Sequence, residues 1–355
     1  MKIKTFFFLF FLFCSVVWGQ NKFTVSGYVK DAKSGETMIG ATIYVQEAKT
    51  GTTSNPYGFY SLSLPSGEYT ILFSYIGYVA VTKKISLTSN LKIDIELQEE
   101  QTQLQEVVVT GIAEDANIKE IEMSVSKVDI KTIQKIPALL GEVDVIRSIQ
   151  LLPGISTVGE GATGFNVRGG DIGQNLVLLD EAPVYNSSHL FGFFSIFNPD
   201  AVKDVKLIKG GIPANYGGRV SSILDVRMKE GNSKEFSANG GIGLIFSRLT
   251  LEAPIVKDKS SFIVAARRSY IDVLAQPFLR NDLKNSIFNF YDLTLKANYN
   301  ISSRDQIFLS GYFGRDNFAA TNAFRSSWGN GTTTFRWNHL FNDRLFSNVT
   351  AYYSN

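Results

Sequence analysis

Cysteine is almost absent from this sequence. The only one among 355 residues, Cys14, lies in an apolar N-terminal leader, so the chain has none once the leader is removed. This excludes disulfides, thiolate metal sites and cysteine nucleophiles together. Histidine is nearly as rare, and His189 and His339 are predicted to lie at a surface or along a lumen rather than to bind a metal.

An excess of charge of one sign is also missing. Lysine and arginine number 35 against 33 aspartates and glutamates, which gives a net charge of +2, and no basic stripe stands out. Nucleic acid is therefore a poor candidate partner. The sequence lacks a nucleophile–base pair, a metal-spaced cluster and a Walker motif, and Arg168–Gly173 lacks the glycine spacing of a dinucleotide loop. We therefore expect no enzyme activity, no cofactor and no metal site.

Long apolar runs are absent beyond the leader. Residues 1–19 have the features of a signal peptide, because Lys2 and Lys4 precede the apolar run Phe6–Phe13 and Val17–Gly19 fits a cleavage site. Lipid attachment at Cys14 is the weaker interpretation, because Phe13 stands directly before the cysteine, where a lipoprotein signal requires a small residue. No later run reaches the roughly 18 apolar residues of a transmembrane helix. Yet aromatic residues make up 13% of the chain, which is high for a soluble protein.

Residues 22–98 alternate between apolar and polar positions over short stretches. The clearest strand is Phe59–Leu64, which lies between the turn residues Asn55–Gly58 and Pro65–Gly67, and Leu91–Leu97 alternates again. Short strands at regular spacing, separated by glycine and proline turns, predict a small antiparallel sandwich.

A polar linker follows and ends in three valines. Gln98–Gln105 has no apolar period, and Val107–Val109 favour extended backbone. A strand without a partner exposes unpaired backbone groups to other chains, which favours aggregation unless pairing with another protein is its role. These valines are either a strand that pairs with a partner, or simply the last strand of the sandwich or the first of the next domain.

The stretch from Phe165 to Gly217 organises the rest of the chain. Its apolar runs Asn175–Leu179 and Val205–Ile208 have the length and composition of buried strands, and a tight turn is expected at Asp180–Pro183. Glycine pairs flank the runs, which indicates close backbone approach or turns with positive φ.

Four motifs in this stretch carry a family resemblance. They are NVRGG at Asn166–Gly170, LLDEAPV at Leu178–Val184, VKLIKGG at Val205–Gly211 and NYGG at Asn215–Gly218. In this order and spacing they resemble the plug domain of TonB-dependent outer-membrane receptors. A soluble α/β domain with glycine turns is the alternative.

The flanking segments resemble other parts of such receptors. GTTSNPYGFYSLSLPSGEYTILFSYIGY, at residues 51–78, resembles the carboxypeptidase regulatory-like domain, a prealbumin-like sandwich that precedes the plug in receptors of Bacteroidetes type. A generic adhesion module is the alternative, and no peptidase activity is implied. The valine segment resembles the TonB box, which pairs by strand addition with the periplasmic domain of TonB. Its residues here are Glu106, Val107, Val108, Val109 and Thr110.

The resemblance implies that residues 112–232 form the plug. A short helix is expected at Val143–Gln150, ended by Pro153 and Gly154. The matching core positions are Arg168, Gly169, Gly170, Asp180, Gly210, Gly211, Tyr216 and Gly217.

Two plug features have open roles. In the family the position of Arg168 is buried, so a carboxylate partner is expected for its guanidinium. The candidate partners are Asp171, Asp180 and Glu181. The ion pair would lock the plug in the barrel rather than touch ligand. The loop Tyr185–Asn198 either meets ligand or packs against the barrel wall.

Residues 233–355 change to segments of about ten alternating residues, as expected for the first strands of an antiparallel transmembrane β-barrel. In Tyr291–Tyr299 odd positions are apolar and aromatic and even positions are polar. The predicted strands are 236–245, 247–255, 260–271, 288–300, 306–314, 332–341 and 345–354. Short connections alternate with long ones at Asp272–Ile287 and Arg315–Gly331, which would be external loops. Seven strands cannot close such a barrel, so we expect a fragment of a longer protein.

The sequence thus predicts a mainly β protein with a prealbumin- or immunoglobulin-like sandwich at 22–98, a linker and TonB box at 99–111, an α/β plug and an incomplete barrel. By resemblance it is an outer-membrane receptor that imports a ligand, energised by TonB with ExbB and ExbD. Outer-membrane lipids are expected around the strands, and a SusD-like surface lipoprotein is a further candidate partner. The alternatives are a TonB-linked signal-transducing receptor and a secreted β-rich adhesion protein.

Overall fold

The computed structural model describes residues 22–100, 124–136, 143–159, 163–279, 286–320 and 324–355. The chain divides into two compact units, one built from the N-terminal strands and the other from most of the remaining residues. No helix among the described residues is long and apolar enough to cross a membrane.

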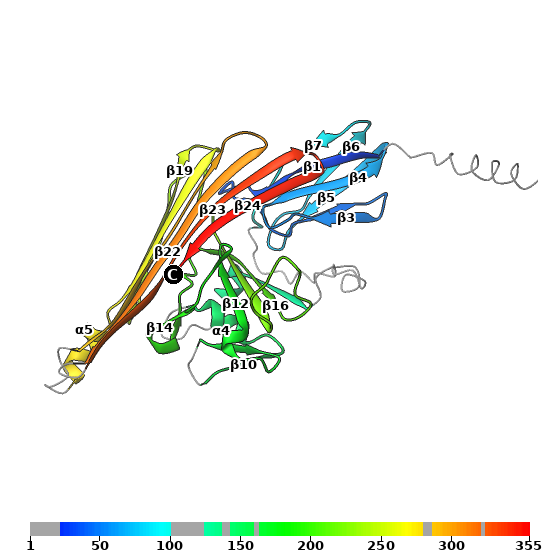
Figure 1. Ribbon diagram of the computed structural model, residues 1–355. Helices are drawn as coiled ribbons and strands as arrows, with labels where there is room; N and C mark the ends of the chain where they lie inside the picture. The colour runs from blue at the N-terminus through cyan, green and yellow to red at the C-terminus, as the bar shows by residue number, and fades with distance from the viewer. Residues whose placement is uncertain (1–21, 101–123, 137–142, 160–162, 280–285, 321–323) are drawn as a thin grey trace, which may run out of the picture. The chain divides into compact units, whose positions relative to one another are not determined.

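The N-terminal unit is a sandwich of two sheets, drawn blue to cyan in Figure 1. One sheet has the order β4-β1-β7 with β8 also paired to β1, and the other has the order β3-β2-β5-β6. Val25, Ile43, Tyr60 and Phe73 are almost fully buried in its core, which confirms the predicted sandwich. The strands are β1 (Lys22–Asp31), β2 (Thr42–Val45), β3 (Thr50–Thr53), β4 (Phe59–Pro65), β5 (Gly67–Ser74), β6 (Val81–Leu87), β7 (Leu91–Lys92) and β8 (Ile95–Leu97).

The second unit begins with a mixed sheet that contains the glycine-flanked motifs. We call the described residues between Ser124 and Glu230 the plug segment. Its five-stranded sheet has the order β13-β12-β17-β16-β9, in which β12 and β17 are parallel and the other neighbours antiparallel. The strands are β9 (Val125–Asp129), β12 (Asn175–Leu179), β13 (Ala182–Pro183), β16 (Val202–Ile208) and β17 (Ser222–Met228). Both predicted buried strands are thus confirmed.

Two short helices cover this sheet. Asp144 caps α4 (Val145–Gln150), since its carboxylate accepts hydrogen bonds from Ile146 N and Arg147 N. Val145, Ile146 and Ile149 then join Leu207 and Val226 in the core. This helix confirms the one predicted before Pro153. The remaining elements are α3 (Ile130–Ile133), β10 (Ile155–Thr157), β11 (Phe165–Val167), η1 (Ile172–Gln174), β14 (Ser188–His189), η2 (Leu190–Gly192) and β15 (Phe194–Ser195).

Seven antiparallel strands follow, drawn yellow to red in Figure 1, and each pairs with the next along the chain. We call them the strand wall. They are β18 (Ser237–Ile242), β19 (Phe246–Val256), β20 (Ser260–Ser269), β21 (Ile287–Asn300), β22 (Asp305–Ala320), β23 (Phe324–Asn342) and β24 (Leu345–Ser354). Between β20 and β21 the chain forms α5 (Ile271–Ala275) and η3 (Gln276–Phe278), where a long connection was predicted.

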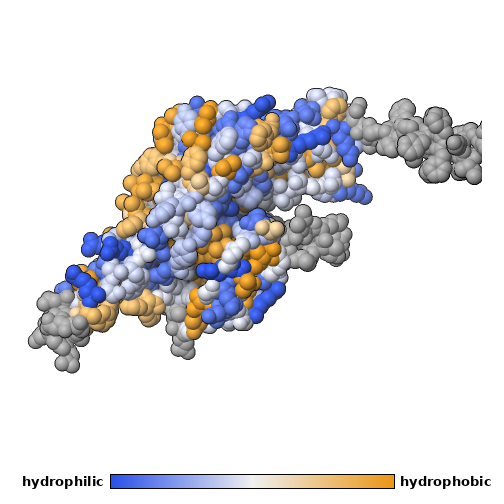
Figure 2. All heavy atoms as spheres, in the orientation of Figure 1, coloured by the Kyte–Doolittle hydropathy of each residue, from blue (hydrophilic) through white to orange (hydrophobic). Residues whose placement is uncertain are grey.

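The two faces of the wall differ in polarity as the alternation predicts. On β21, Asp292 and Lys296 are 2% and 3% exposed, whereas Tyr291 and Leu295 are 39% and 42% exposed. The other exposed apolar side chains of the central strands include Leu249, Leu309, Phe313, Phe335 and Trp337. Figure 2 shows apolar residues gathered along the outward edge of the first wall strands.

One predicted external loop is wrong. In the described part of Arg315–Gly331, β22 and β23 stay paired, from Arg315 opposite Gly329 to Ala320 opposite Phe324. A Cβ at Gly329 would collide with Gly314 O, so this glycine permits close strand pairing rather than marking a loop. Residues that were predicted to connect two strands therefore belong to the strands themselves and extend the wall.

Candidate functional site

The inner face of the wall meets the plug segment through charged side chains. At the turn after β12, Asp180 and Glu181 adopt positive φ angles of 49° and 76°. This turn confirms the one expected at Asp180–Pro183 and points two carboxylates away from the plug sheet. We call these carboxylates and their partners, with Asp225, Arg227, Lys296 and Arg336, the turn cluster.

Asp180 is the buried anchor of the turn cluster. Its Oδ2 lies 2.9 Å from Lys296 Nζ on β21, and both side chains are almost fully buried. The ammonium also donates to Met228 O at 3.0 Å, while Met228 N donates to Asp180 Oδ1 at 3.2 Å. The wall lysine is therefore bound to two neighbouring strands of the plug sheet.

Glu181 extends the cluster to the last wall strands. Its Oε1 lies 2.5 Å from Arg227 Nη1 and 3.5 Å from Arg336 Nη1, and its Oε2 accepts a hydrogen bond from Thr350 Oγ1. Arg227 in turn pairs with Asp225 at 2.9 Å. Three carboxylates thus face three cations, so the buried charge is balanced.

The turn cluster keeps both turn carboxylates ionised. Burial alone would raise the pKa of Asp180, but Lys296, Arg336 and Arg227 outweigh it and hold that pKa well below its ordinary value. Burial opposes ionisation of Glu181 in the same way, and Arg227 and Arg336 lower its pKa despite it.

A second set of contacts surrounds His189, which is buried rather than at a surface. Its Nδ1 lies 2.8 Å from Asp316 Oδ2 on β22 and its Nε2 lies 3.3 Å from Asp292 Oδ2 on β21. The ring stacks on Phe290 with centroids 4.3 Å apart. We call His189, Arg267, Asp292, Tyr312 and Asp316 the histidine cluster.

Arg267 of β20 completes the histidine cluster. Its Nη2 lies 2.7 Å from Asp292 Oδ2 and also donates to Ser195 O of the plug segment at 2.7 Å. The guanidinium lies over the Phe290 ring, 5.2 Å from its centroid. One wall arginine therefore holds a wall carboxylate and the plug backbone together.

Further contacts tie other parts of the plug segment to the first wall strands. Arg248 Nε lies 2.8 Å from Asp200 Oδ2. Ser261 Oγ and Asn298 Nδ2 each donate to Glu230 O at 2.8 Å. Attachment is thus distributed along β19–β21 rather than restricted to one point.

The loop Tyr185–Asn198 packs mainly against the wall. Phe194 meets Phe246 edge-on at 5.4 Å, and Phe191 lies 5.3 Å from Phe318 and 4.9 Å from Trp328. The contacts of these rings favour the packing role over the ligand-contact role. Tyr185, which is 71% exposed, is the part of the loop open to solvent.

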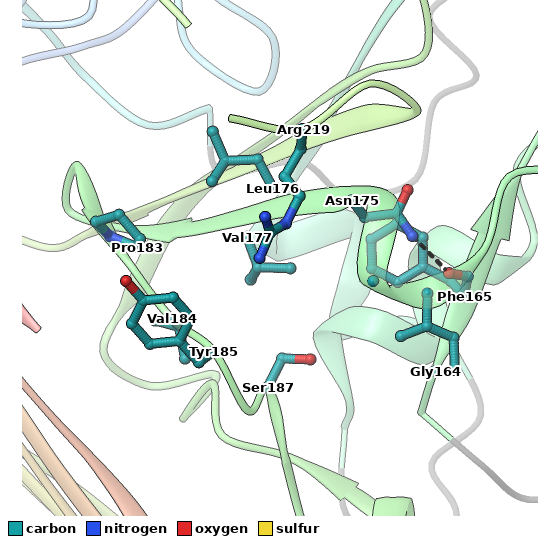
Figure 3. Close-up of a pocket in the computed structure, with 12 residues that line it drawn as sticks. Gly164, Phe165, Asn175, Leu176, Val177, Pro183, Val184, Tyr185, Ser187 and Arg219 are labelled. Atoms are coloured by element: carbon teal, nitrogen blue, oxygen red, sulfur yellow. Dashed lines mark hydrogen bonds between the residues drawn. The ribbon is translucent and has the colours of Figure 1, made fainter. Parts of the chain in front are cut away.

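Tyr185 borders a small pocket of about 100 Å³ on the plug segment. Figure 3 shows Tyr185, Ser187 and Arg219 around an apolar floor that includes Val177. The Asn175 amide points away, since its Nδ2 donates to Phe165 O at 2.8 Å. The pocket thus offers an arginine, a phenol and a hydroxyl to a small ligand.

The prediction of a buried Arg168 is wrong. The side chain is exposed, and its Nη2 donates to Ser124 Oγ at 2.5 Å. The reason is local: Phe165 and Val167 occupy the buried positions of β11, and φ of 52° at Arg168 starts the turn on the opposite side. The proposed partner Asp180 is bound to a wall lysine instead.

The predicted glycine positions divide into three groups. Gly170 and Gly210 lie in close approach, because an added Cβ would meet Ser221 or the Arg168 guanidinium. Gly169 and Gly211 have φ of 80° and 62°, which requires glycine for another reason. Gly217 is exposed with open space around it, so it is not part of a packed core. Tyr216 is half-buried and packs beside Ile208.

The predicted TonB box, Glu106–Thr110, lies outside the described residues. Within the described ranges no group of histidine, cysteine, aspartate and glutamate side chains could hold a metal ion.

The wall half of the site was not singled out from the sequence. Lys296, Arg336, Asp292 and Asp316 all occupy inward positions of alternating strands. A charge at an inward position of a predicted barrel strand is the signal that could have identified them. Their plug partners depend on tertiary packing and could not be read from spacing.

Comparison with known families covers both units. Residues 25–109 match the CarboxypepD_reg-like domain, and residues 117–222 match the TonB-dependent Receptor Plug Domain. The first range includes Val107–Val109, for which the sequence left both a TonB box and a final sandwich strand open.

Curated relatives are receptors of Bacteroidetes type. The chain is 28% identical to TonB-dependent receptor SusC of Bacteroides thetaiotaomicron over 252 residues, 65% of this chain and 24% of that protein. It is 29% identical to TonB-dependent receptor P3 of Formosa agariphila over 131 residues, 37% of this chain and 13% of that protein. The chain thus spans a quarter or less of the length of these relatives.

Comparison with solved structures finds siderophore receptors among the matches. The receptor PirA from Pseudomonas aeruginosa matches with a TM-score of 0.48 and 16% identity, over 65% of this chain and 40% of that one. PirA from Acinetobacter baumannii matches with a TM-score of 0.47 and 13% identity, over 66% and 40%. The CarboxypepD_reg-like and plug matches, together with the SusC-type relatives, lead to one conclusion: this chain belongs to the TonB-dependent receptors.

Proposed function

We propose that this chain is the N-terminal part of an outer-membrane importer whose plug closes the barrel and is displaced by TonB. The observation that carries the proposal is the set of balanced, buried ion pairs between the plug segment and the inner face of the wall. Breaking a buried pair costs several kcal/mol, whereas an intact pair adds little net stability. Such contacts define one seated position and give way together when the plug is pulled.

The proposal assigns a role to each part of the chain. Residues 1–19 are the signal peptide, residues 22–98 the periplasmic sandwich, and residues 99–111 a linker with the TonB box. Residues 112–232 form the plug and residues 233–355 the first barrel strands. The exposed apolar side chains of the wall then face lipid, and its inward charges face the plug.

The partners follow from the same proposal. TonB, driven through ExbB and ExbD, pairs with Glu106–Thr110 by strand addition. Similarity to SusC supports a SusD-like surface lipoprotein as a further partner. The sandwich fold of the N-terminal unit supports import over the signal-transducing alternative, because resemblance to receptors of that kind would imply a βαβ fold for the extra N-terminal domain.

A growth experiment with two valine variants tests the proposal. A strain lacking the full-length receptor is compared with wild type on limiting carbohydrate, peptide and iron-chelate sources, and the source on which it fails identifies the cargo class. Val108→Pro should fail on that same source, because proline removes a backbone donor from the added strand. Val108→Thr should grow normally, because the backbone makes the pairing. Normal growth of the proline variant, at equal surface amount, would contradict TonB-box pairing here.

A further inference from the structure

His189 occupies an unusual position between the plug segment and the wall. Both of its ring nitrogens face carboxylates, and these carboxylates come from different strands: Asp316 of β22 at 2.8 Å and Asp292 of β21 at 3.3 Å. The side chains of all three residues are at most 2% exposed. Water therefore cannot substitute for a missing hydrogen bond at this place.

The geometry favours a doubly protonated ring. A neutral imidazole carries one N–H, so it could donate to only one carboxylate and would turn a lone pair toward the other. A doubly protonated ring donates to both. Its charge, with that of Arg267, also balances Asp292 and Asp316, so the buried cluster is neutral only when His189 is charged.

The other groups around the ring agree with this assignment. Tyr312 Oη lies 3.2 Å from Nε2 and can accept the hydrogen bond shared with Asp292. Phe290 stacks on the ring face, and Arg267 reaches Asp292 from the far side. A Cβ on Gly314 would lie 3.1 Å from His189 Cε1, so this glycine leaves room for the ring against β22.

The histidine also holds a strained turn. Leu190 and Phe191 have φ of 49° and 59°, values that residues other than glycine rarely adopt. Leu190 N donates to Asp316 Oδ1 at 2.7 Å, so the same carboxylate holds the ring and the strained backbone. Release of His189 from Asp316 would remove one of these two bonds and would therefore loosen the turn that carries Phe191 and Phe194 onto the wall.

We infer that His189 is a proton-dependent latch: the charged imidazole fastens the loop Tyr185–Asn198 to β21 and β22, and loss of its proton loosens that loop. His189 acts as a positioning residue for the plug. The latch concerns the resting seat of the plug and does not depend on which ligand is imported.

The direction of the pH effect follows from the contacts. Burial alone would lower the pKa of His189, but hydrogen bonds to Asp292 and Asp316 outweigh it, so the pKa is raised above its ordinary value. A group with a raised pKa in the seated state stabilises that state fully below its free pKa of about 6.5. The stabilisation is lost as the pH rises through the raised value.

Hydrogen exchange of the full-length receptor in detergent micelles tests the latch. Exchange of the amides in Ser187–Ile196 is followed between pH 6 and pH 9 and corrected for the intrinsic pH dependence of exchange. In wild type their protection should fall about tenfold or more toward pH 9. In His189→Gln it should be low at both ends, because glutamine cannot place charged donors on two carboxylates.

Controls separate the latch from general damage. His339→Gln changes the other histidine of this sequence, which is partly exposed and paired with Asp305, and should behave as wild type. The amides of β20–β22 should stay protected in every variant. Ring nitrogen NMR of the wild-type receptor, assigned by the signals lost in His189→Gln, should show a doubly protonated ring at neutral pH. A neutral ring, or pH-independent protection in wild type, would overturn the inference even if the glutamine variant failed to fold.

Discussion

At the scale of single residues, much of the plug segment's hold on the wall comes from side chains in or beside its turns. Asp180 and Glu181 stand in a tight turn with positive φ, and His189 lies just before another. In a strand, such side chains would alternate with apolar neighbours that pack in the plug core. A turn frees consecutive carboxylates to point the same way, which is how one short segment reaches three wall strands.

Asp180→Asn should weaken the seated plug by about 3 kcal/mol, because it leaves Lys296 buried without a counter-charge. Native-state hydrogen exchange of Val177–Leu179 in the full-length receptor measures this as roughly a hundredfold loss of protection. Asp258→Asn is the matched control, since Asp258 is exposed in a wall turn with φ of 59° that asparagine tolerates. Equal protection in the two variants would show that the buried pair does not hold the plug.

Residue roles were predicted less well than residue positions. The turn at Asp180 was expected because it directly follows an apolar run, but Asp180 was considered only as one of three candidate partners of Arg168. The structure pairs Asp180 with Lys296, which is 116 residues away in sequence. Sequence spacing cannot show such a pair, because the register between plug and wall is set by packing.

At the scale of elements, the long hairpin β22–β23 departs most from expectation. Arg315–Gly331 was predicted as a long connection, and Ser326, Ser327, Gly329 and Gly331 within it are common turn formers. Pairing across the hairpin overrode this preference, because glycines fit where the two strands approach closely. The remaining wall strands were predicted closely, because their alternation of exposed apolar and buried polar residues is continuous.

The hairpin makes a measurable prediction. Amides of Arg315–Ala320 and Phe324–Gly329 should exchange nearly as slowly as those in the centre of β22, because their hydrogen bonds close a ladder. Exchange within seconds, as expected of an open external loop, would refute the extended hairpin. The exchange rates of the Leu309–Phe313 amides, in the centre of β22, serve as the reference within the same molecule.

At the scale of the whole molecule, inward charges join two layers that the sequence predicted separately. The alternation predicted the wall and the four glycine-rich motifs predicted the plug segment. Their relation appears in buried contacts such as those of Asp180, Glu181 and His189. The central claim is therefore that the plug is seated by these contacts and must leave its seat for import.

Cross-linking the plug to the wall tests that claim most directly. Ala201 of the plug segment packs with Ala265 of β20 in one buried cluster, so Ala201→Cys with Ala265→Cys can join the two layers. The control pair, Ala265→Cys with Thr294→Cys, joins neighbouring wall strands and leaves the plug free. The measurement is growth on the source that requires the full-length receptor, with the cross-link oxidised and then reduced. The account predicts that the plug–wall cross-link stops growth until it is reduced, while the control pair has no effect; normal growth with the plug fastened to the wall would contradict it.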